Sequence, residues 1–192
     1  DCPVDPDNCP EGTTYMPEYL GQFDVCVPND FSLVAQSSAQ GFYFFNSVTT
    51  IDGVPVDPND WVGVYNGDIC VGAQKWDISE CSGVCSVTAM GDDGLVPATA
   101  NYLHTGDIPS FKVFDLSDGA YYTAVASEDI PWQDGTFPTI ESLDVVQDCA
   151  GIWGGDSELD ECGVCDGNGV EEACDCIDTS GLNADGCCDD VT

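Results

Sequence analysis

The sequence predicts an all-β fold, a β-sandwich of the immunoglobulin-like or jelly-roll-like kind, flanked by irregular segments rich in Cys and Asp. Short runs of β-branched and aromatic residues recur at regular spacing, separated by turn dipeptides. No stretch shows a sustained apolar period of about 3.6 residues, which a helix packed on a core would show. The composition changes at both ends of the chain, and this change predicts the two flanking segments.

The strand signals lie in residues 30–146, a segment of about 115 residues that is large enough for its own core. The expected strands, about seven in number, are residues 41–45, 47–51, 61–65, 69–73, 111–114, 120–125 and 140–146. Turn dipeptides separate several of them, namely Asp52-Gly53, Asn66-Gly67 and Asp118-Gly119. This segment is the expected sandwich.

The two flanks differ from this segment. Residues 1–29 contain three cysteines and five prolines with little periodicity, which indicates an N-terminal arm or linker. Residues 147–192 have sparse large apolar side chains, and seven cysteines and thirteen acids fall within residues 148–192. So small a segment cannot fold on apolar burial alone. The cysteine spacing in this tail suggests a ladder of short loops tied by sulfur and by an ion that neutralises Asp.

The charge of the chain excludes two classes of partner. The sequence has 36 acidic side chains against two lysines and no arginine, a formal net charge of −34. It therefore cannot neutralise a phosphate backbone, and an anionic membrane surface would repel it. No apolar run approaches about 18 residues, so no membrane insertion is expected. The acids comprise 27 Asp and 9 Glu, an excess that favours loops and the coordination of hard cations.

The cysteine content indicates an oxidising compartment. Thirteen cysteines in 192 residues suggest disulfides, and the odd number leaves at least one cysteine free or bonded to another molecule. The chain starts at Asp1 without an initiator Met or a signal peptide. We therefore expect a processed product or a piece of a longer secreted chain, located outside the cell or at its surface.

Calcium is the expected cofactor, because acids cluster in segments that cysteines constrain. Asp156, Glu158 and Asp160 stand at i, i+2 and i+4, so they can converge on one ion as in the first half of an EF-hand loop. Without a counter-ion such carboxylates would repel one another. The predicted ligands are Asp156, Glu158, Asp160, Asp166, Asn168, Asp175, Asp178, Asn183, Asp185 and Asp189, with Asp5 and Asp7 in the arm. A merely solvated acidic surface is the less favoured reading.

Two further groups have alternative interpretations. Cys162 and Cys165, with Cys174 and Cys176, have a spacing that resembles a zinc site, but an Asp-rich extracellular context favours disulfides and calcium. The acids of residues 52–60 are a weaker candidate metal site, for which turn chemistry is favoured.

No enzymatic activity is expected. His104 is the only histidine, and we expect it at the surface rather than in a catalytic triad. No phosphate loop or nucleophile elbow is present. Lys75 and Lys112 are expected to form local ion pairs. The four tryptophans are expected in the core, the alternative being a platform on which sugars stack.

Several motifs resemble those of known extracellular repeats. Residues 148–167 resemble the DCAG…GG…D-x-CGVC-x-G segment that recurs in large secreted and surface proteins of aquatic bacteria. Residues 7–10 (DNCP) resemble the signature of thrombospondin type 3 calcium repeats, although the tail lacks their regular D-x-D-x-D-G string. Residues 41–73 are similar to β-modules found in tandem between such segments. The resemblance implies an extracellular, calcium-stabilised repeat unit, exported by a type IX-like route, and it implies no activity.

The sequence thus predicts a structural subunit or repeat of an extracellular bacterial fibre or surface protein, rigidified by calcium and disulfides. Its expected partners are copies of itself in a head-to-tail polymer, or adjacent repeats. The alternative is a carbohydrate-binding or adhesion module of a larger secreted protein, with glycans as partners.

Overall fold

The computed structural model describes residues 9–20, 22–47, 49–81, 84–155, 157–160 and 163–167. The chain divides into two compact units, Asp1–Val146 and Gln147–Thr192. Within the described ranges, no helix has the length and apolar character needed to cross a membrane.

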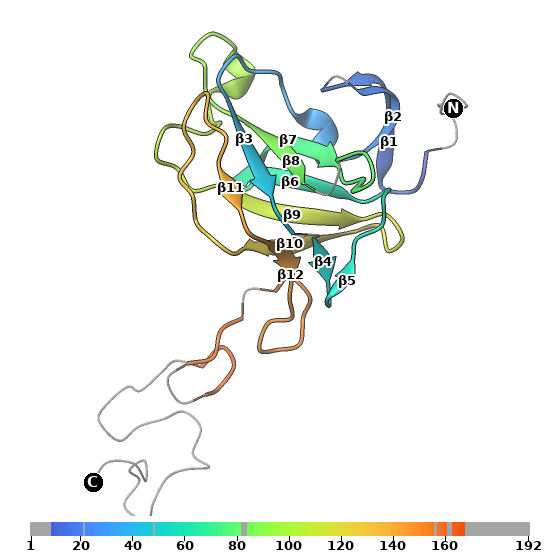
Figure 1. The fold of residues 1–192 in the computed structure, drawn as a ribbon, viewed down its shortest axis with the longest axis vertical. Helices are drawn as coiled ribbons and strands as arrows, with labels where there is room; N and C mark the ends of the chain where they lie inside the picture. Colours follow the sequence, from blue (N-terminus) through green and yellow to red (C-terminus); the bar gives the residue numbers. More distant parts are fainter. Residues whose placement is uncertain are drawn as a thin grey trace, which may run out of the picture. The chain divides into compact units, whose positions relative to one another are not determined.

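The first unit is a β-sandwich of a seven-stranded and a three-stranded sheet (Figure 1). In spatial order the larger sheet contains β5 (Val54–Pro55), β4 (Thr50–Ile51), β12 (Leu143–Val145), β10 (Ala120–Ala126), β9 (Ser110–Asp115), β6 (Trp61–Asn66) and β7 (Ile69–Lys75). The smaller sheet contains β11 (Thr139–Ile140), β3 (Gln40–Phe45) and β8 (Cys85–Met90). Neighbouring strands are antiparallel, except that β12 is parallel to β4 and β11 is parallel to β3. The all-β sandwich predicted from the sequence is confirmed.

Aromatic side chains join the two sheets across the core. The ring centroid of Phe111 on β9 lies 5.8 Å from that of Tyr43 and 5.4 Å from that of Phe45, both on β3. Phe45 also makes an edge contact at 5.9 Å with Trp76, which follows β7. All four side chains are buried. The alternating burial along β3 follows from this packing, because successive side chains of a strand point to opposite faces.

Strand β6 is buried at all five positions from Trp61 to Tyr65 because both of its faces are covered. Trp61 and Tyr65 belong to a second buried cluster, on the face away from the three-stranded sheet. Val62 and Val64 are fully buried between the two sheets. The large sheet is therefore sandwiched between β3–β8 on one side and a further element on the other.

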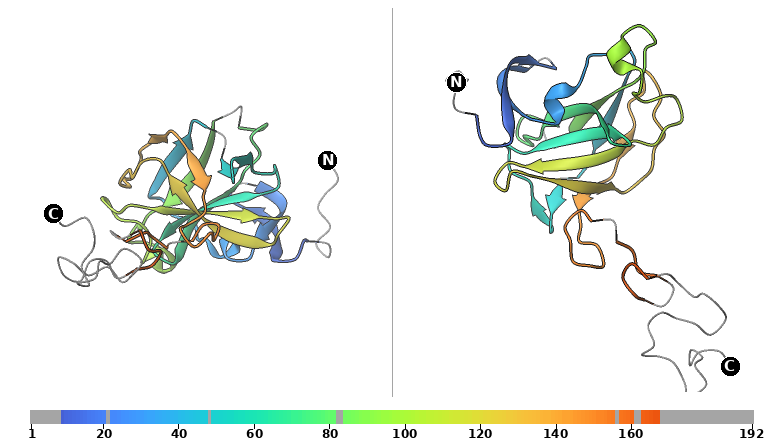
Figure 2. Two further views of the ribbon diagram at one scale, coloured as in Figure 1. Left: turned by 90° about the horizontal axis from the view of Figure 1, so that it is seen from below. Right: turned by 180° about the vertical axis from the view of Figure 1, so that it is seen from behind.

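That further element is a hairpin of β1 (Thr13–Tyr19) and β2 (Gln22–Pro28). The hairpin, in dark blue, lies at one side of the sandwich in both views of Figure 2. A disulfide between Cys9 and Cys26 ties it to the chain that precedes it. The prolines and cysteines of residues 1–29 predict an irregular arm, and the structure instead gives β1 and β2 a regular hairpin within the first unit.

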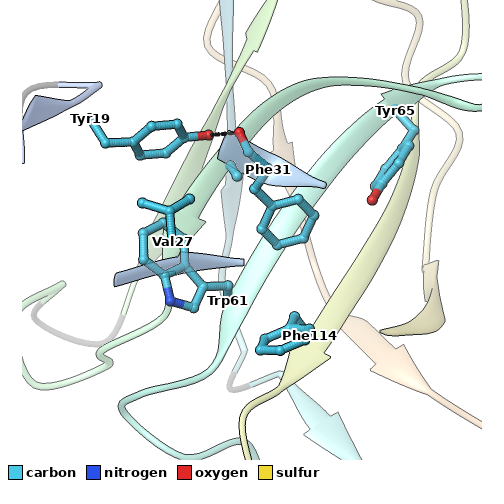
Figure 3. Close-up of a cluster of buried hydrophobic side chains, with 7 residues drawn as sticks. Tyr19, Val27, Phe31, Trp61, Tyr65 and Phe114 are labelled. Carbon is cyan, nitrogen blue, oxygen red and sulfur yellow. Dashed lines mark hydrogen bonds between the residues drawn. The ribbon is translucent and has the colours of Figure 1, made fainter. Parts of the chain in front are cut away.

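The hairpin folds because it has a surface to cover. Tyr19 and Val27 are buried with Phe31, Trp61 and Phe114 in the second cluster (Figure 3). The Tyr19 hydroxyl donates a hydrogen bond of 2.6 Å to the Phe31 carbonyl, in the 3-10 turn η2 (Phe31–Leu33). A two-stranded hairpin is marginal alone, and this apolar burial supplies the stabilisation it lacks.

The expected strands all appear in the sheets, with some changes. The last one is split into β11 and β12, and residues 47–51 contribute only the two residues of β4. The Asp52-Gly53 turn is confirmed, since both residues have the positive φ, 54° and 70°, that a type I′ turn requires. Strands β5 and β8 were not predicted, nor was the short turn η3 (Pro97–Thr99).

Candidate functional site

The described part of the second unit contains two successive loops with the same hydrogen bonds, twelve residues apart. In the first, the Asp148 amide donates to the Ile152 carbonyl and the Gly151 amide donates to the Asp148 carbonyl, each at 3.0 Å. The same two bonds, each 2.9 Å long, recur in the second loop at Asp160, Gly163 and Val164. We call these the Asp148 loop (Asp148, Gly151, Ile152 and Gly155) and the Asp160 loop (Asp160, Gly163, Val164 and Gly167).

A carboxylate occupies the inside of the Asp148 loop. The Asp148 carboxylate accepts backbone N–H bonds from Ala150 at 2.9 Å, from Ile152 at 2.8 Å and from Ser157 at 3.3 Å. Donors of this kind favour the charged form, so they hold the pKa of Asp148 below its ordinary value, with the Ile152 amide contributing most. Asp148 therefore organises the loop as its central acceptor.

The Asp160 loop repeats this arrangement. The Val164 amide donates to Asp160 Oδ1 at 2.8 Å. Gly155 lies against the Asp148 carboxylate, and Gly167 lies against the Asp160 carboxylate. A Cβ at either glycine would overlap with the neighbouring carboxylate oxygen. The pattern D-x-x-G followed four residues later by Gly is thus a structural repeat, with a carboxylate packed on glycine in each copy.

Covalent and polar contacts connect the two loops. A disulfide joins Cys149 to Cys165. The Cys149 amide donates to the Ser157 carbonyl at 3.4 Å, and the Asp166 amide donates to the Glu158 carbonyl at 2.9 Å. This matches the expected ladder of loops tied by sulfur. It also removes Cys165 as a thiolate ligand, so the zinc interpretation is wrong at this residue.

Three of the twelve predicted calcium ligands lie in the described residues. Glu158 is exposed, Asp160 faces the inside of its loop, and Asp166 accepts a 2.9 Å hydrogen bond from the Ser157 hydroxyl. Across the described ranges, no three His, Cys, Asp or Glu side chains gather as a metal site would require. The other nine predicted ligands lie outside the described residues: Asp5, Asp7, Asp156, Asn168, Asp175, Asp178, Asn183, Asp185 and Asp189.

The acids before β6 serve in turns, as expected. Asp57 Oδ1 accepts from the Asn59 amide at 2.9 Å, which is an Asx turn. Asp60 is buried and accepts from the amides of Leu116 at 3.0 Å and Asp57 at 2.7 Å. Burial raises the pKa of Asp60. This carboxylate therefore joins the loop before β6 to the β9–β10 turn.

His104 is at the surface, as predicted, with 62% of its side chain exposed. Its ring nitrogens lie 3.5 Å from an Asp92 oxygen and 3.7 Å from an Asp107 oxygen. Both of these described neighbours are carboxylates, whereas a catalytic triad pairs its histidine with a nucleophilic hydroxyl or thiol.

The tryptophans are mostly core residues, as predicted. Trp61, Trp76 and Trp132 are 2%, 1% and 3% exposed, and Trp153 is half-buried. The Trp132 indole donates to the Ala89 carbonyl at 3.0 Å. The first three tryptophans therefore offer no exposed platform on which a sugar would stack.

The expected ion pairs of the two lysines are not found. Within the described residues, neither Lys75 nor Lys112 lies within 4.0 Å of a carboxylate oxygen. Lys112 instead places its Nζ 4.6 Å from the centroid of the Tyr65 ring. Lys112 lies on β9 beside β6, which carries Tyr65, so its ammonium can contact the face of that ring.

Lys112 lies in a cavity of about 400 Å³ at the surface of the first unit. We call it the Lys112 pocket. Its lining includes Asp30, Leu33, Tyr65, Asp68, Ile69 and Lys112. Cys70 also lines it and is the one free cysteine among the described residues. Burial raises the pKa of its thiol to about 12, so Cys70 stays a protonated thiol at neutral pH.

In comparisons with known proteins, the chain matches no protein-family model, no curated protein and no solved structure. Two features are therefore available from which to infer a function. They are the stapled loops of the second unit and the Lys112 pocket of the first.

Proposed function

We propose that this chain is a structural subunit or repeat of an extracellular bacterial fibre or surface protein. The observation that carries the proposal is the pair of equivalent loops, each with a carboxylate packed on glycine, joined by the Cys149–Cys165 disulfide. Such loops take their order from hydrogen bonds and a covalent link rather than from an apolar core. A segment of this kind suits a spacer between sandwich domains better than a site for chemistry.

Disulfides support the location outside the cell. Three are formed in the described residues: Cys9–Cys26, Cys81–Cys85 and Cys149–Cys165. Disulfides persist in oxidising compartments and are rare in a reducing cytosol. The resemblance of residues 148–167 to segments of large secreted and surface proteins agrees with this location.

Calcium is part of the proposal. The tail beyond the two loops is rich in carboxylates and carries the six predicted ligands Asn168, Asp175, Asp178, Asn183, Asp185 and Asp189. The loop segment carries four more: Asp156, Glu158, Asp160 and Asp166. Extracellular modules bind calcium at about 10⁻⁴ to 10⁻³ M, so 1 mM calcium stabilises each site by about 0.4 to 1.4 kcal/mol. Chelation with EDTA is expected to lower the melting temperature of the second unit, and an unchanged melting temperature would exclude structural calcium there.

Assembly is proposed to be head-to-tail. Such a contact joins two different surfaces and therefore propagates into a filament instead of closing into a dimer. The acidic surface keeps a long assembly soluble and prevents lateral bundling by mutual repulsion. The test is whether the particle lengthens with protein concentration when calcium is present.

The alternative function is a carbohydrate-binding or adhesion module of a larger secreted protein. The buried tryptophans cannot stack on a sugar, which weakens this alternative. The Lys112 pocket supports it, because it offers a cavity in which a small ligand could bind. This cavity presents donors, acceptors and apolar walls together, the combination that small-molecule sites use. Both functions leave the chain without a catalytic role.

A further inference from the structure

The Lys112 pocket is formed by parts of the chain that are far apart in the sequence. Asp30 and Leu33 come from the start and end of the η2 turn, Tyr65 and Asp68 from β6 and its hairpin turn, and Lys112 from β9. Its volume of about 400 Å³ lies in the range of about 300–1,000 Å³ that small-molecule sites occupy. No part of the proposed structural function uses this cavity.

Lys112 brings an unmatched positive charge to the pocket. Its described partner is the ring of Tyr65, with Nζ 4.6 Å from the ring centroid. No carboxylate oxygen of the described residues lies within 4.0 Å of it. The ammonium carries three N–H donors, and a ring face satisfies them only in part. The chain has 36 acids and only two lysines, so a lysine ammonium without a carboxylate partner is unusual in it.

Tyr65 adds a second group that lacks a partner. The residue is 3% exposed, and its hydroxyl is buried with no hydrogen-bond partner in the described part of the chain. Figure 3 shows this hydroxyl apart from the hydrogen bond that joins Tyr19 to Phe31. A buried polar atom without a partner destabilises the folded state, because it loses its hydrogen bonds to water. A hydroxyl group of a ligand, or a water held by one, would supply the missing bond.

The remaining walls define what fits. The carboxylates of Asp30 and Asp68 accept hydrogen bonds, whereas Leu33 and Ile69 offer apolar surface. An anion would meet two carboxylates in a chain of net charge −34, and a simple cation has no acceptor for the N–H donors of Lys112. A neutral ring with several hydroxyls offers both donors and acceptors. Its hydroxyls donate to the carboxylates and accept from Lys112, and its C–H face packs on the aliphatic side chains.

We infer that the Lys112 pocket binds one neutral hexose unit of a glycan. This inference rests on the adhesive alternative and is independent of filament formation, because sugar binding and particle length are measured separately. Lys112 and Tyr65 supply donors, Asp30 and Asp68 supply acceptors, and Leu33 and Ile69 form the apolar side.

The test is saturation-transfer NMR on the full chain with four neutral probes, D-glucose, D-galactose, D-mannose and N-acetyl-D-glucosamine, and with D-glucuronate as the charged comparator. We expect at least one neutral probe to bind with a millimolar Kd and glucuronate to bind more weakly. Lys112→Met keeps the aliphatic stem and removes the charge, so it should weaken binding at least about 10-fold. Lys75→Met removes the only other lysine and should leave the affinity unchanged.

Tyr65→Phe is the second variant, because it keeps the ring beneath Lys112 and removes only the hydroxyl. It should fold with unchanged or higher stability and weaken binding of the same probe several-fold. The inference is overturned if none of the four neutral probes binds, if glucuronate binds more tightly than they do, or if Lys112→Met and Lys75→Met bind alike. Should Lys112→Met fail to fold, wild-type affinity in Tyr65→Phe would overturn it.

Discussion

Asp148 and Asp160 occupy equivalent positions in two successive loops, where each carboxylate accepts a backbone N–H four residues ahead, at 2.8 Å in both cases. Each carboxylate also packs against a glycine seven residues ahead, Gly155 and Gly167. The described part of the second unit is thus built by repeating a turn whose centre is a charged group. Its stability should therefore depend on the space beside that group, on its ionisation and on the disulfide between the loops.

Replacing Gly155 by Ala tests the space beside the carboxylate. The added Cβ would overlap with the Asp148 carboxylate, so the N–H bonds to that carboxylate should lengthen or break. These bonds order the loop, so we expect hydrogen-exchange protection of the Ile152 amide to fall about 10-fold. Ala150→Ser, at an exposed position of the same loop, is the control. Equal protection in the two variants would show that the close packing is not needed.

The ionisation of Asp148 should make the first loop sensitive to acid. Its backbone donors hold the folded-state pKa below the value of about 3.9 expected in an unfolded chain. The carboxylate therefore stabilises the loop above that unfolded value, and the contribution is lost as the pH falls through the folded pKa. Exchange of the Ile152 amide should accelerate, relative to its intrinsic rate, in this acid range. Asp148→Asn should abolish the transition, and an identical pH profile in that variant would assign it to another group.

The Cys149–Cys165 disulfide should hold the two loops together. It closes a sequence separation of 16 residues, for which the chain-entropy estimate is about 3 kcal/mol. The double variant Cys149→Ser with Cys165→Ser should therefore be cleaved by proteases within residues 148–167 at enzyme concentrations that leave the wild type intact. The sandwich should keep its melting temperature. Loss of the sandwich transition together with the loops would contradict the division into two units.

Tyr19→Phe tests the docking of the hairpin. The Tyr19 hydroxyl donates to the Phe31 carbonyl in a buried contact, so its removal leaves an acceptor without that bond. We expect a loss of about 1–2 kcal/mol in urea unfolding with an unchanged m value. Tyr122→Phe is the matched control, because the Tyr122 hydroxyl donates to Asp118 at an exposed site and should contribute little. Similar losses in both variants would refute a special role for the buried bond.

The fold was largely predictable from the sequence because alternating burial leaves a direct pattern. In β3, Tyr43 and Phe45 face the core and alternate with residues of intermediate exposure, as a strand with one covered face requires. The β1–β2 hairpin was missed because its two-residue turn begins with Leu20, at φ 46°, instead of a usual turn residue. Strand β8 was missed because its sequence, CSVTAM, contains few strongly β-forming residues.

The site was less predictable. The convergence of Asp156, Glu158 and Asp160 on an ion stays a prediction, and the structure adds that Asp160 Oδ1 accepts the Val164 N–H within its own loop. Asp148 was overlooked as a loop centre, although the D-x-x-G pattern at residues 148–151 and 160–163 contained the signal. The Lys112 pocket could not be found from the sequence, because Asp30, Tyr65 and Lys112 meet only through the pairing of β6 with β9 and the placement of η2.

Small-angle X-ray scattering over a concentration series, with 1 mM calcium and with EDTA, tests the central claim most directly. If the chain is a subunit of a head-to-tail fibre, the maximum particle dimension should grow with concentration in calcium while the cross-sectional radius stays constant. EDTA should shorten the particles. A scattering curve that remains that of one chain at every concentration, with and without calcium, would contradict the fibre proposal.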